Sequence, residues 1–419
     1  MPSSAKVRPC AWAVASWKYR LLAAWAFVAC AEASEPPATG PLIELPLLAP
    51  IDPTKPFNHS AEATLVANGG HVAVAATQLH LDSETSFGTT NLLRKVAVIA
   101  SHDRGERFGA AMDPGGGPST SDPVLRAGED GTFWLAALDT DHANSAIVAE
   151  SDDQGRSFRE VARGVATLDK EWLVVDARAR ALYIAAAGGV FRIAYDGAVS
   201  GSNVLAAYGE SGCSGEGGAV FAVREAGTLH TRLLSYDGAS EPVLRGPVID
   251  AGDAAVPRAA AAASLGRTLD GGYFLVHTFR SAVASEVRLL LRATLDEAGT
   301  ELSLSRPSKI AFHPAAAIDA AGRLHAIWYE SDGPTGMLVY VRSKSARFQE
   351  GFSEPRIIDP QACPGGGFYP GEADTEPTGG RRLREYIDIA IDGSRAHFAW
   401  THAPVAPSRV YTSYRDFEP

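Results

Sequence analysis

A single supersecondary unit recurs along most of this chain, and the repetition restricts the fold more than any other feature. In each copy a short apolar strand leads through a tight turn, usually with glycine, into a second strand rich in Val, Ile, Ala and aromatic residues. No segment shows the sustained 3.6-residue apolar period of an amphipathic helix, so we expect an all-β protein. Seven such hairpins occur, at residues 63–76, 123–137, 172–186, 219–234, 259–279, 315–329 and 386–400.

The spacing of the hairpins predicts the architecture. Four strands in about 45 residues is the repeat of a β-propeller blade, so we predict one propeller of four-stranded blades. Seven hairpins indicate seven blades, with six as the alternative. Alanine-rich first strands such as 315–317 suit the innermost position, where strands converge on the axis and leave little room for side chains.

The two ends of the chain predict how the ring closes. The last hairpin is followed by only one further strand, at 409–414, so its blade lacks a fourth strand. Residues 42–48, LIELPLL, precede the first hairpin and have no partner of their own. We therefore expect this N-terminal segment to be the outer strand of the last blade, where Pro46 is tolerated because the strand is an edge.

Composition excludes several classes of partner. The 419 residues are 46% apolar, which is enough for a large core, and the net charge is −11. An acidic chain without a basic stripe is a poor ligand for nucleic acid or for an anionic membrane surface. We expect a monomer that binds no nucleic acid.

The N-terminus has the pattern of an export signal. Four basic residues precede the apolar stretch 21–30, and small residues follow it at Ala29, Ala31 and Ala33. This pattern predicts a signal peptide over 1–33, a linker over 34–41 and the propeller over 42–419, in a periplasmic or extracellular protein. The alternative is an outer-membrane lipoprotein, because residues 27–30, FVAC, resemble a lipobox that would place a lipid on Cys30 as the only membrane contact.

Two cysteines remain after the signal segment. Cys213 and Cys363 lie in glycine-rich stretches of an exported chain, where a disulfide can form. The sequence alone leaves that bridge open, since its geometry is not known.

Two stretches of the chain are nearly superimposable, since both follow the pattern S-x-D-x-G-x-x-F. Asp and Ser side chains in such a turn accept backbone N–H bonds, and Gly permits a positive φ. The pattern resembles the Asp box, or bacterial neuraminidase repeat, of sialidase-like propellers. The resemblance implies a structural turn between the third and fourth strands of a blade, on the face opposite the active site. Its residues are Ser101, Asp103, Gly105 and Phe108 in one copy, and Ser151, Asp153, Gly155 and Phe158 in the other.

The sialidase-like family implies a specific chemistry, which this chain matches only in part. In the family, three arginines hold the substrate carboxylate, a Tyr activated by a Glu is the nucleophile, and an Asp is the acid/base. The family's Arg-Ile-Pro phrase is missing before the first Asp box, and Phe191-Arg192-Ile193 is followed by Ala194. Candidate catalytic residues are Tyr386, Glu385 and Asp122.

Residues just before each innermost strand are expected to converge at the entrance of the central cavity. We expect the ligand contacts there. The alternative for each of these residues is a structural role, as a polar group at a strand end that forms hydrogen bonds with a neighbouring loop. No nucleophile elbow, zinc-protease motif or phosphate loop is present, so no cofactor and no metal is expected. The ligand-contact residues are Glu62, Asp122, Asp169, Lys170, Glu171, Arg258, His313 and Tyr386, with Glu216 and Glu385 on the same rim.

Three functions are consistent with these patterns. The first is an exported propeller that recognises a glycan or an extracellular or envelope protein through its cavity. The second is a divergent exo-glycoside hydrolase of sialidase-like type. The third is a structural protein of the cell envelope.

Overall fold

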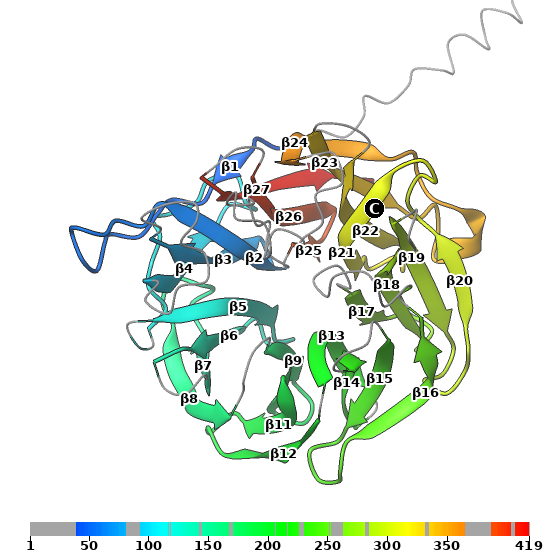
Figure 1. Ribbon diagram of the computed structural model, residues 1–419, viewed down its shortest axis with the longest axis horizontal. Helices are drawn as coiled ribbons and strands as arrows, with labels where there is room; N and C mark the ends of the chain where they lie inside the picture. Colours follow the sequence, from blue (N-terminus) through cyan, green and yellow to red (C-terminus); the bar gives the residue numbers. More distant parts are fainter. Residues whose placement is uncertain are drawn as a thin grey trace, which may run out of the picture. The chain divides into compact units, whose positions relative to one another are not determined.

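The structure is a computed structural model, and seven antiparallel sheets surround a common axis in it (Figure 1). The seven-bladed propeller predicted by the hairpins is confirmed, and the six-bladed alternative is wrong. The part of the chain that the structure describes contains no helix of the length and apolarity needed to cross a bilayer. The residues described are 39–80, 93–115, 117, 119–141, 145–166, 171–205, 207–215, 217–225, 230–250, 252, 263–280, 285–331, 335–364, 387–403 and 407–418.

Blades are numbered here in chain order, and the strands of each blade are given from the axis outward. Blade 1 consists of β2 (His59–Asn68), β3 (His71–Leu79) and β4 (Arg94–Ser101). Blade 2 consists of β5 (Thr120–Ala127), β6 (Phe133–Asp139), β7 (Ser145–Ser151) and β8 (Arg159–Ala166). Blade 3 consists of β9 (Trp172–Asp176), β10 (Ala181–Ala186), β11 (Gly188–Ala194) and β12 (Val199–Leu205).

Blade 4 consists of β13 (Ala207–Gly215), β14 (Gly218–Glu225), β15 (Thr231–Tyr236) and β16 (Val243–Ile249). Blade 5 consists of β17 (Ala263–Arg267), β18 (Tyr273–Arg280), β19 (Ser285–Arg292) and β20 (Thr300–Ser303). Blade 6 consists of β21 (Ile310–Ile318), β22 (Leu324–Ser331), β23 (Thr335–Arg342) and β24 (Arg356–Pro364). Blade 7 consists of β25 (Asp388–Asp392), β26 (Arg395–His402), β27 (Arg409–Asp416) and, outermost, β1 (Ile43–Glu44). A short 3₁₀ helix, η3, spans Phe348–Glu350.

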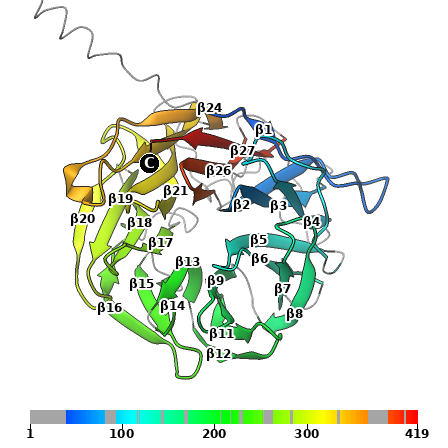
Figure 2. The same cartoon turned by 180° about the vertical axis from the view of Figure 1, so that it is seen from behind.

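The N-terminal strand closes the ring, as the sequence predicts. Strand β1 pairs antiparallel with β27, placing Ile43 opposite Thr412 and Glu44 opposite Tyr411. Both views show the blue β1 beside the red β27 (Figures 1 and 2). Leu45 follows β1, and its side chain is buried among residues of blades 7 and 1. The first and last blades are therefore joined by backbone pairing and by a shared core.

The cores lie between neighbouring blades, because each sheet buries both of its faces. Trp134 of blade 2 packs with apolar residues of blade 3, Trp328 of blade 6 with residues of blade 5, and Trp400 of blade 7 with residues of blade 6. All three indoles are almost completely buried.

Blade 1 departs from the expected four strands. Beyond β4 it has a single bridge, in which Val98 and Met112 exchange backbone hydrogen bonds of 2.9 and 2.8 Å. Residues 113–118 read DPGGGP. Proline has no backbone N–H to donate to a neighbouring strand and glycine has no side chain to pack, so this sequence disfavours a longer fourth strand.

Blade 4 corrects one of the predicted hairpins. Residues 219–223 were expected to be the innermost strand, but they lie in β14, the second strand, and β13 is innermost. Strand β13 contains little apolar alternation because space near it is tight. A Cβ on Gly212 would lie 2.6 Å from Val174 and 2.7 Å from Phe221. Glycine at this position permits the close approach. It also removes the apolar side chain from whose alternation a strand is predicted.

Cys213 in β13 and Cys363 in β24 are both free thiols, so the bridge that the sequence left open is not formed. Burial raises the pKa of each thiol to about 12. Neither cysteine is therefore a thiolate near neutral pH.

The strand directions define two faces of the ring. We call the end at which the innermost strands begin the mouth face, and the opposite end the turn face. Because each sheet is antiparallel, the turns after the first and third strands lie on the turn face. The hydrogen bond from Arg104 N–H to the Gly70 carbonyl, 2.9 Å, joins two such turns of blade 1.

The two S-x-D-x-G-x-x-F turns have the same hydrogen bonds. Ser101 Oγ accepts the Gly105 N–H at 2.9 Å, and Asp103 Oδ1 accepts the Arg107 N–H at 2.9 Å. The backbone N–H of Arg107 and then its side chain lower the pKa of Asp103 to about 2. In the second copy, Ser151 Oγ accepts from Gly155 at 2.7 Å and Asp153 Oδ1 accepts from Ser157 at 2.9 Å.

The aromatic residue of each turn fills a gap between blades. Phe108 packs against the core shared by blades 7 and 1, and Phe158 against the core shared by blades 1 and 2. These turns therefore fix the spacing of neighbouring blades on the turn face.

Substitution of the turn aspartate should destabilise the fold. Asp153→Ala removes the acceptor of the exposed Ser157 N–H and of the part-buried Ser151 hydroxyl, and a hydrogen bond of this kind contributes about 0.5–1.5 kcal/mol. Asp152→Ala is the matched control, because Asp152 is exposed in the same turn, and we expect its effect to stay within about 0.5 kcal/mol. Urea unfolding of both variants measures the difference, and equal effects would contradict a structural role of Asp153.

Candidate functional site on the mouth face

Three innermost strands carry the same strained bulge near the mouth face. Glu62 in β2, Asp122 in β5 and His313 in β21 have φ values of 61°, 53° and 50°. Each lies where the pairing with the second strand shifts register, between residues 61 and 64, 121 and 124, or 312 and 315. A left-handed conformation costs a residue with a side chain about 1–3 kcal/mol, and such strain clusters at functional sites.

Two of the bulged residues are linked across a blade boundary. Thr77 Oγ1 donates to Glu62 Oε2 at 2.5 Å, and the Asp122 N–H contacts the same oxygen at 3.3 Å and Thr77 Oγ1 at 3.0 Å. Ser121 Oγ donates to Asp122 Oδ2 at 2.8 Å. Glu62 is 2% exposed and Asp122 8%. The Glu62 carboxyl group thus contacts the backbone of Asp122 across the blade boundary, while the Asp122 carboxyl group accepts from Ser121 of its own strand.

The other described members of the predicted rim are also buried. His313 is 1% exposed and lies edge-on to the rings of Phe312 and Tyr329, at 5.5 and 6.4 Å between centroids. Glu171, just before β9, is fully buried. Four ionisable side chains of the predicted rim are therefore buried at the mouth face. Changing the charge or the hydrogen-bond partner of a buried ionisable group has a large effect on the free energy of the folded state.

Apart from Glu216, the other predicted rim residues stay predictions. Glu216 was expected to precede an innermost strand, but β13 ends before it and β14 begins after it, so this expectation is wrong. Asp169, Lys170, Glu216, Arg258, Glu385 and Tyr386 lie outside the residues that the structure describes.

A charged network that the sequence analysis missed lies deeper in the central channel. The channel has a volume of about 280 Å³ and is lined by all seven blades, mostly by apolar residues and backbone. Within it Arg126 pairs with Asp388 at 3.0 Å and lies over the Trp172 ring, 4.8 Å from its centroid. Asp388 Oδ2 also accepts from Thr64 Oγ1 at 2.8 Å. The available signal was a charged residue between two apolar neighbours, Arg126 between Leu125 and Ala127 and Asp388 between Ile387 and Ile389.

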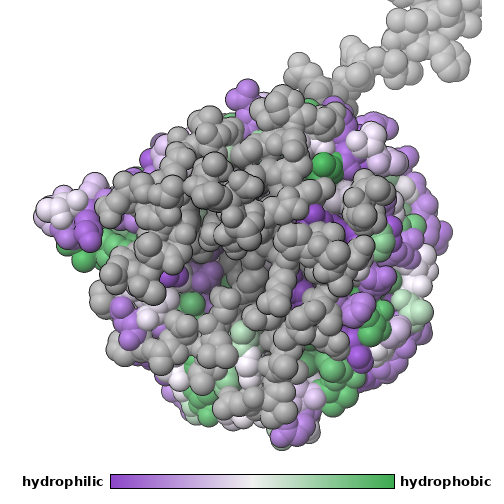
Figure 3. Space-filling model, viewed as in Figure 1, coloured by the Kyte–Doolittle hydropathy of each residue, from purple (hydrophilic) through white to green (hydrophobic). Residues whose placement is uncertain are grey.

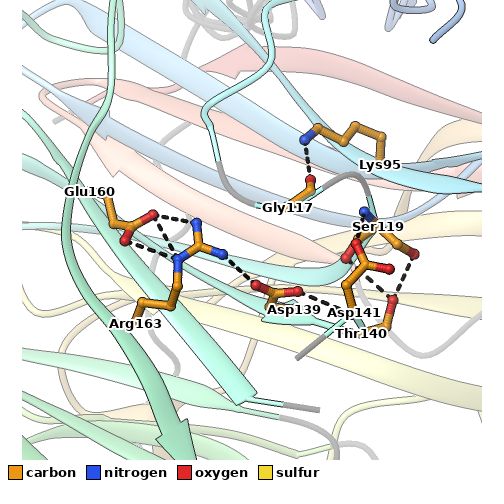
Figure 4. A network of polar contacts seen from close by, with 8 residues as sticks. All are labelled: Lys95, Gly117, Ser119, Asp139, Thr140, Asp141, Glu160 and Arg163. Carbon is orange, nitrogen blue, oxygen red and sulfur yellow. Dashed lines mark hydrogen bonds and ion pairs between the residues drawn. The ribbon is translucent and has the colours of Figure 1, made fainter. Parts of the chain in front are cut away.

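The outer part of the mouth face carries a separate polar network between blades 1 and 2 (Figure 4). Lys95 Nζ donates to the Gly117 carbonyl at 2.6 Å and pairs with Asp113 at 3.0 Å. Arg163 pairs with the buried Asp139 and with Glu160, each at 2.5 Å. The charges in this network already pair with one another, which is typical of structural support.

The described residues hold no group of three or more His, Cys, Asp or Glu side chains arranged for a metal ion. The described periphery shows hydrophilic residues with small hydrophobic patches among them (Figure 3).

Comparison with known proteins gives the fold and no family. No protein-family model matches the sequence, and neither does any curated protein. A Dyadobacter fermentans protein of unknown function has a TM-score of 0.56 at 12% identity, over 91% of this chain and 99% of that one. A fungal alcohol oxidase of the AA5 family, described in complex with copper, has 0.55 at 9% identity, over 91% and 76%.

The NanB sialidase of Streptococcus pneumoniae has a TM-score of 0.46 at 12% identity, over 90% of this chain and 70% of that one. The two structures with TM-scores above 0.5 show that this chain shares their fold, and fold alone does not assign an activity.

Proposed function

We propose that this chain is an exported propeller of the Asp-box type that recognises a glycan or protein ligand at the mouth face. The observation that carries the proposal is the repeated bulge that holds Glu62, Asp122 and His313 in left-handed conformation. Three separate strands retain this strain at the same position of the ring, and backbone strain of this kind clusters at functional sites. Carboxylates and imidazole supply the acceptors and donors that sugar hydroxyls require.

The two turns of identical geometry support the relation to Asp-box propellers. They lie on the turn face, away from the bulged residues, as the resemblance implies. The export signal belongs to the same proposal, because a secreted propeller meets glycans and envelope proteins.

A glycoside hydrolase is the second candidate, and it is favoured by the presence of a carboxylic residue at the same bulge of two neighbouring blades, Glu62 and Asp122. Glycosidases commonly place two carboxyl groups on either side of the scissile bond, one of them as general acid. In this candidate Asp122 is the acid/base residue and Tyr386, next to Glu385, is the nucleophile.

A glycan array and a panel of fluorogenic glycosides test the proposal on protein recovered from the exporting cell. Its intact mass should show a chain that begins between residues 30 and 34, and a diacylglyceryl mass on Cys30 would identify the lipoprotein form. We expect binding without turnover. Glu62→Gln and Asp122→Asn should weaken that binding at least tenfold, while the turn-face variant Asp152→Asn leaves it unchanged.

Two results would contradict the binding function. Unchanged affinity in both carboxyl variants, with unchanged melting temperature, would remove the mouth face as the site. Turnover of a sialoside that Tyr386→Phe abolishes would establish the hydrolase instead.

A further inference from the structure

A second cavity lies on the turn face, between blades 4 and 5. It has a volume of about 480 Å³, larger than the central channel. Blade 4 contributes the end of β15 and the turn to β16, and blade 5 contributes the hairpin between β17 and β18 and the end of β19. Its volume lies within the range of small-molecule sites in proteins, about 300–1,000 Å³.

This boundary lacks the aromatic wedge that two other blade boundaries carry on the turn face. On the turn face, Phe108 fills the gap between blades 7 and 1, and Phe158 the gap between blades 1 and 2. The matching turns of blades 4 and 5, residues 237–242 and 293–299, contain no phenylalanine. Leu295 is the apolar residue that blade 5 places there, and it is smaller.

The lining presents hydrogen-bonding groups of both kinds. Arg267 lies over the ring of Tyr273, 5.6 Å from its centroid, and donates to the Gly271 carbonyl at 3.0 Å. Its Nε is buried and has no hydrogen-bond partner among the described residues. This guanidinium, held by the Tyr273 ring and the Gly271 carbonyl, places a cationic group in the cavity wall.

The charges of the lining balance. Arg245 and Arg267 are cationic, while Asp237 and Glu241 are anionic. Arg245 is held by Asp296, with one contact of 2.9 Å and one of 2.5 Å, and Asp237 already accepts from the backbone of Ala239 at 2.9 Å. An anionic ligand would meet two carboxylates and a cationic ligand two guanidinium groups. A neutral ligand with many hydroxyls meets neither penalty and uses both donors and acceptors.

We propose that the cavity between blades 4 and 5 is a second ligand site, which binds a neutral sugar residue or a short neutral oligosaccharide. This site is independent of the one proposed on the mouth face, from which it is separated by the full height of the ring. A chain with both sites holds a ligand at each end of the propeller.

Ligand-observed NMR with methyl glycosides of neutral hexoses and pentoses, and with maltose and cellobiose, tests this site on the full chain. Ser240→Trp fills the cavity from an exposed lining position, and Arg267→Ala removes a guanidinium group from the lining. We expect at least one of these sugars to bind, and each variant to weaken that binding at least tenfold.

Arg180→Ala is the matched control, because Arg180 lies over Tyr195 in blade 3 at 5.2 Å and does not line this cavity. It should leave sugar binding unchanged, and the melting temperature of each variant shows that the fold is intact. No binding by any of the sugars would overturn the proposal, as would binding that survives Ser240→Trp. Binding that Glu62→Gln removes and Arg267→Ala spares would assign the sugar to the mouth face alone.

Discussion

Lowering the pH from about 6.5 to about 4 should remove most of the stability of this protein. His59, His325 and His397 are 7%, 0% and 1% exposed. Burial, more than any other cause, lowers the pKa of each to about 4, against an ordinary value of 6.5. Arg409 acts in the same direction on His59 and Arg395 on His397, while Asp319 partly offsets burial at His325.

The sign follows from which state binds the proton. The folded chain keeps these rings neutral, whereas the unfolded chain protonates them below about pH 6.5. Stability from the three rings is therefore complete above pH 6.5, falls as the pH drops toward 4, and is lost below it. Each ring accounts for roughly 3 kcal/mol across this window, so three account for about 10 kcal/mol. That sum is comparable to the whole stability of a typical domain.

Urea unfolding followed by tryptophan fluorescence at several pH values between 7 and 4 measures this loss. His397→Gln should reduce the slope of stability against pH by about one proton, because one of the three rings is removed. The control His230→Gln changes an exposed ring and should leave the slope as it was. A stability that stays constant between pH 7 and 4.5 would contradict the explanation.

The second large effect is expected at the closure of the ring. Leu45 is 1% exposed and lies in the core shared by blades 7 and 1, and its N–H donates to the Val410 carbonyl at 2.8 Å. Leu45→Ala should lower the free energy of unfolding by about 2–5 kcal/mol, since it leaves a cavity at the one boundary that depends on the chain ends.

Leu42→Ala is the matched control, because Leu42 belongs to the same segment and is 45% exposed. Its effect should stay within about 0.5 kcal/mol. Denaturant unfolding of the two variants gives the comparison, and a Leu45 effect as small as that of Leu42 would show that the N-terminal segment does not hold the ring.

The fold was predictable because its pattern is local and repeated. Alternating apolar strands and glycine turns specify hairpins, and counting them gives the blades. The prediction failed in blade 4, where a side chain in place of Gly209 or Gly212 would clash with blade 3 or, at Gly212, also with Phe221 of the same blade. Close packing there removes the very alternation from which a strand is recognised.

The candidate site was predictable only in part. Polar residues beside Pro123 and Pro314 marked the starts of innermost strands, so Asp122 and His313 were found, and Glu62 by its place in the repeat. Their left-handed backbone was not visible in the sequence, because it arises from register shifts between strands. The Arg126–Asp388 pair and the cavity between blades 4 and 5 depend on how neighbouring blades pack together, which a pattern along the chain does not record.

The pairing of the first strand with the last also sets the order of events when the chain is made. The hydrogen bond from Tyr411 to Glu44 joins residues 367 positions apart in the sequence. Because the ribosome adds about 5–20 residues per second, Tyr411 is synthesised roughly 20 to 70 s after Glu44. Throughout that interval the N-terminal strand has no edge to pair with. The propeller therefore completes its fold only after its last blade has emerged, and contacts of such high sequence separation make that final step slow.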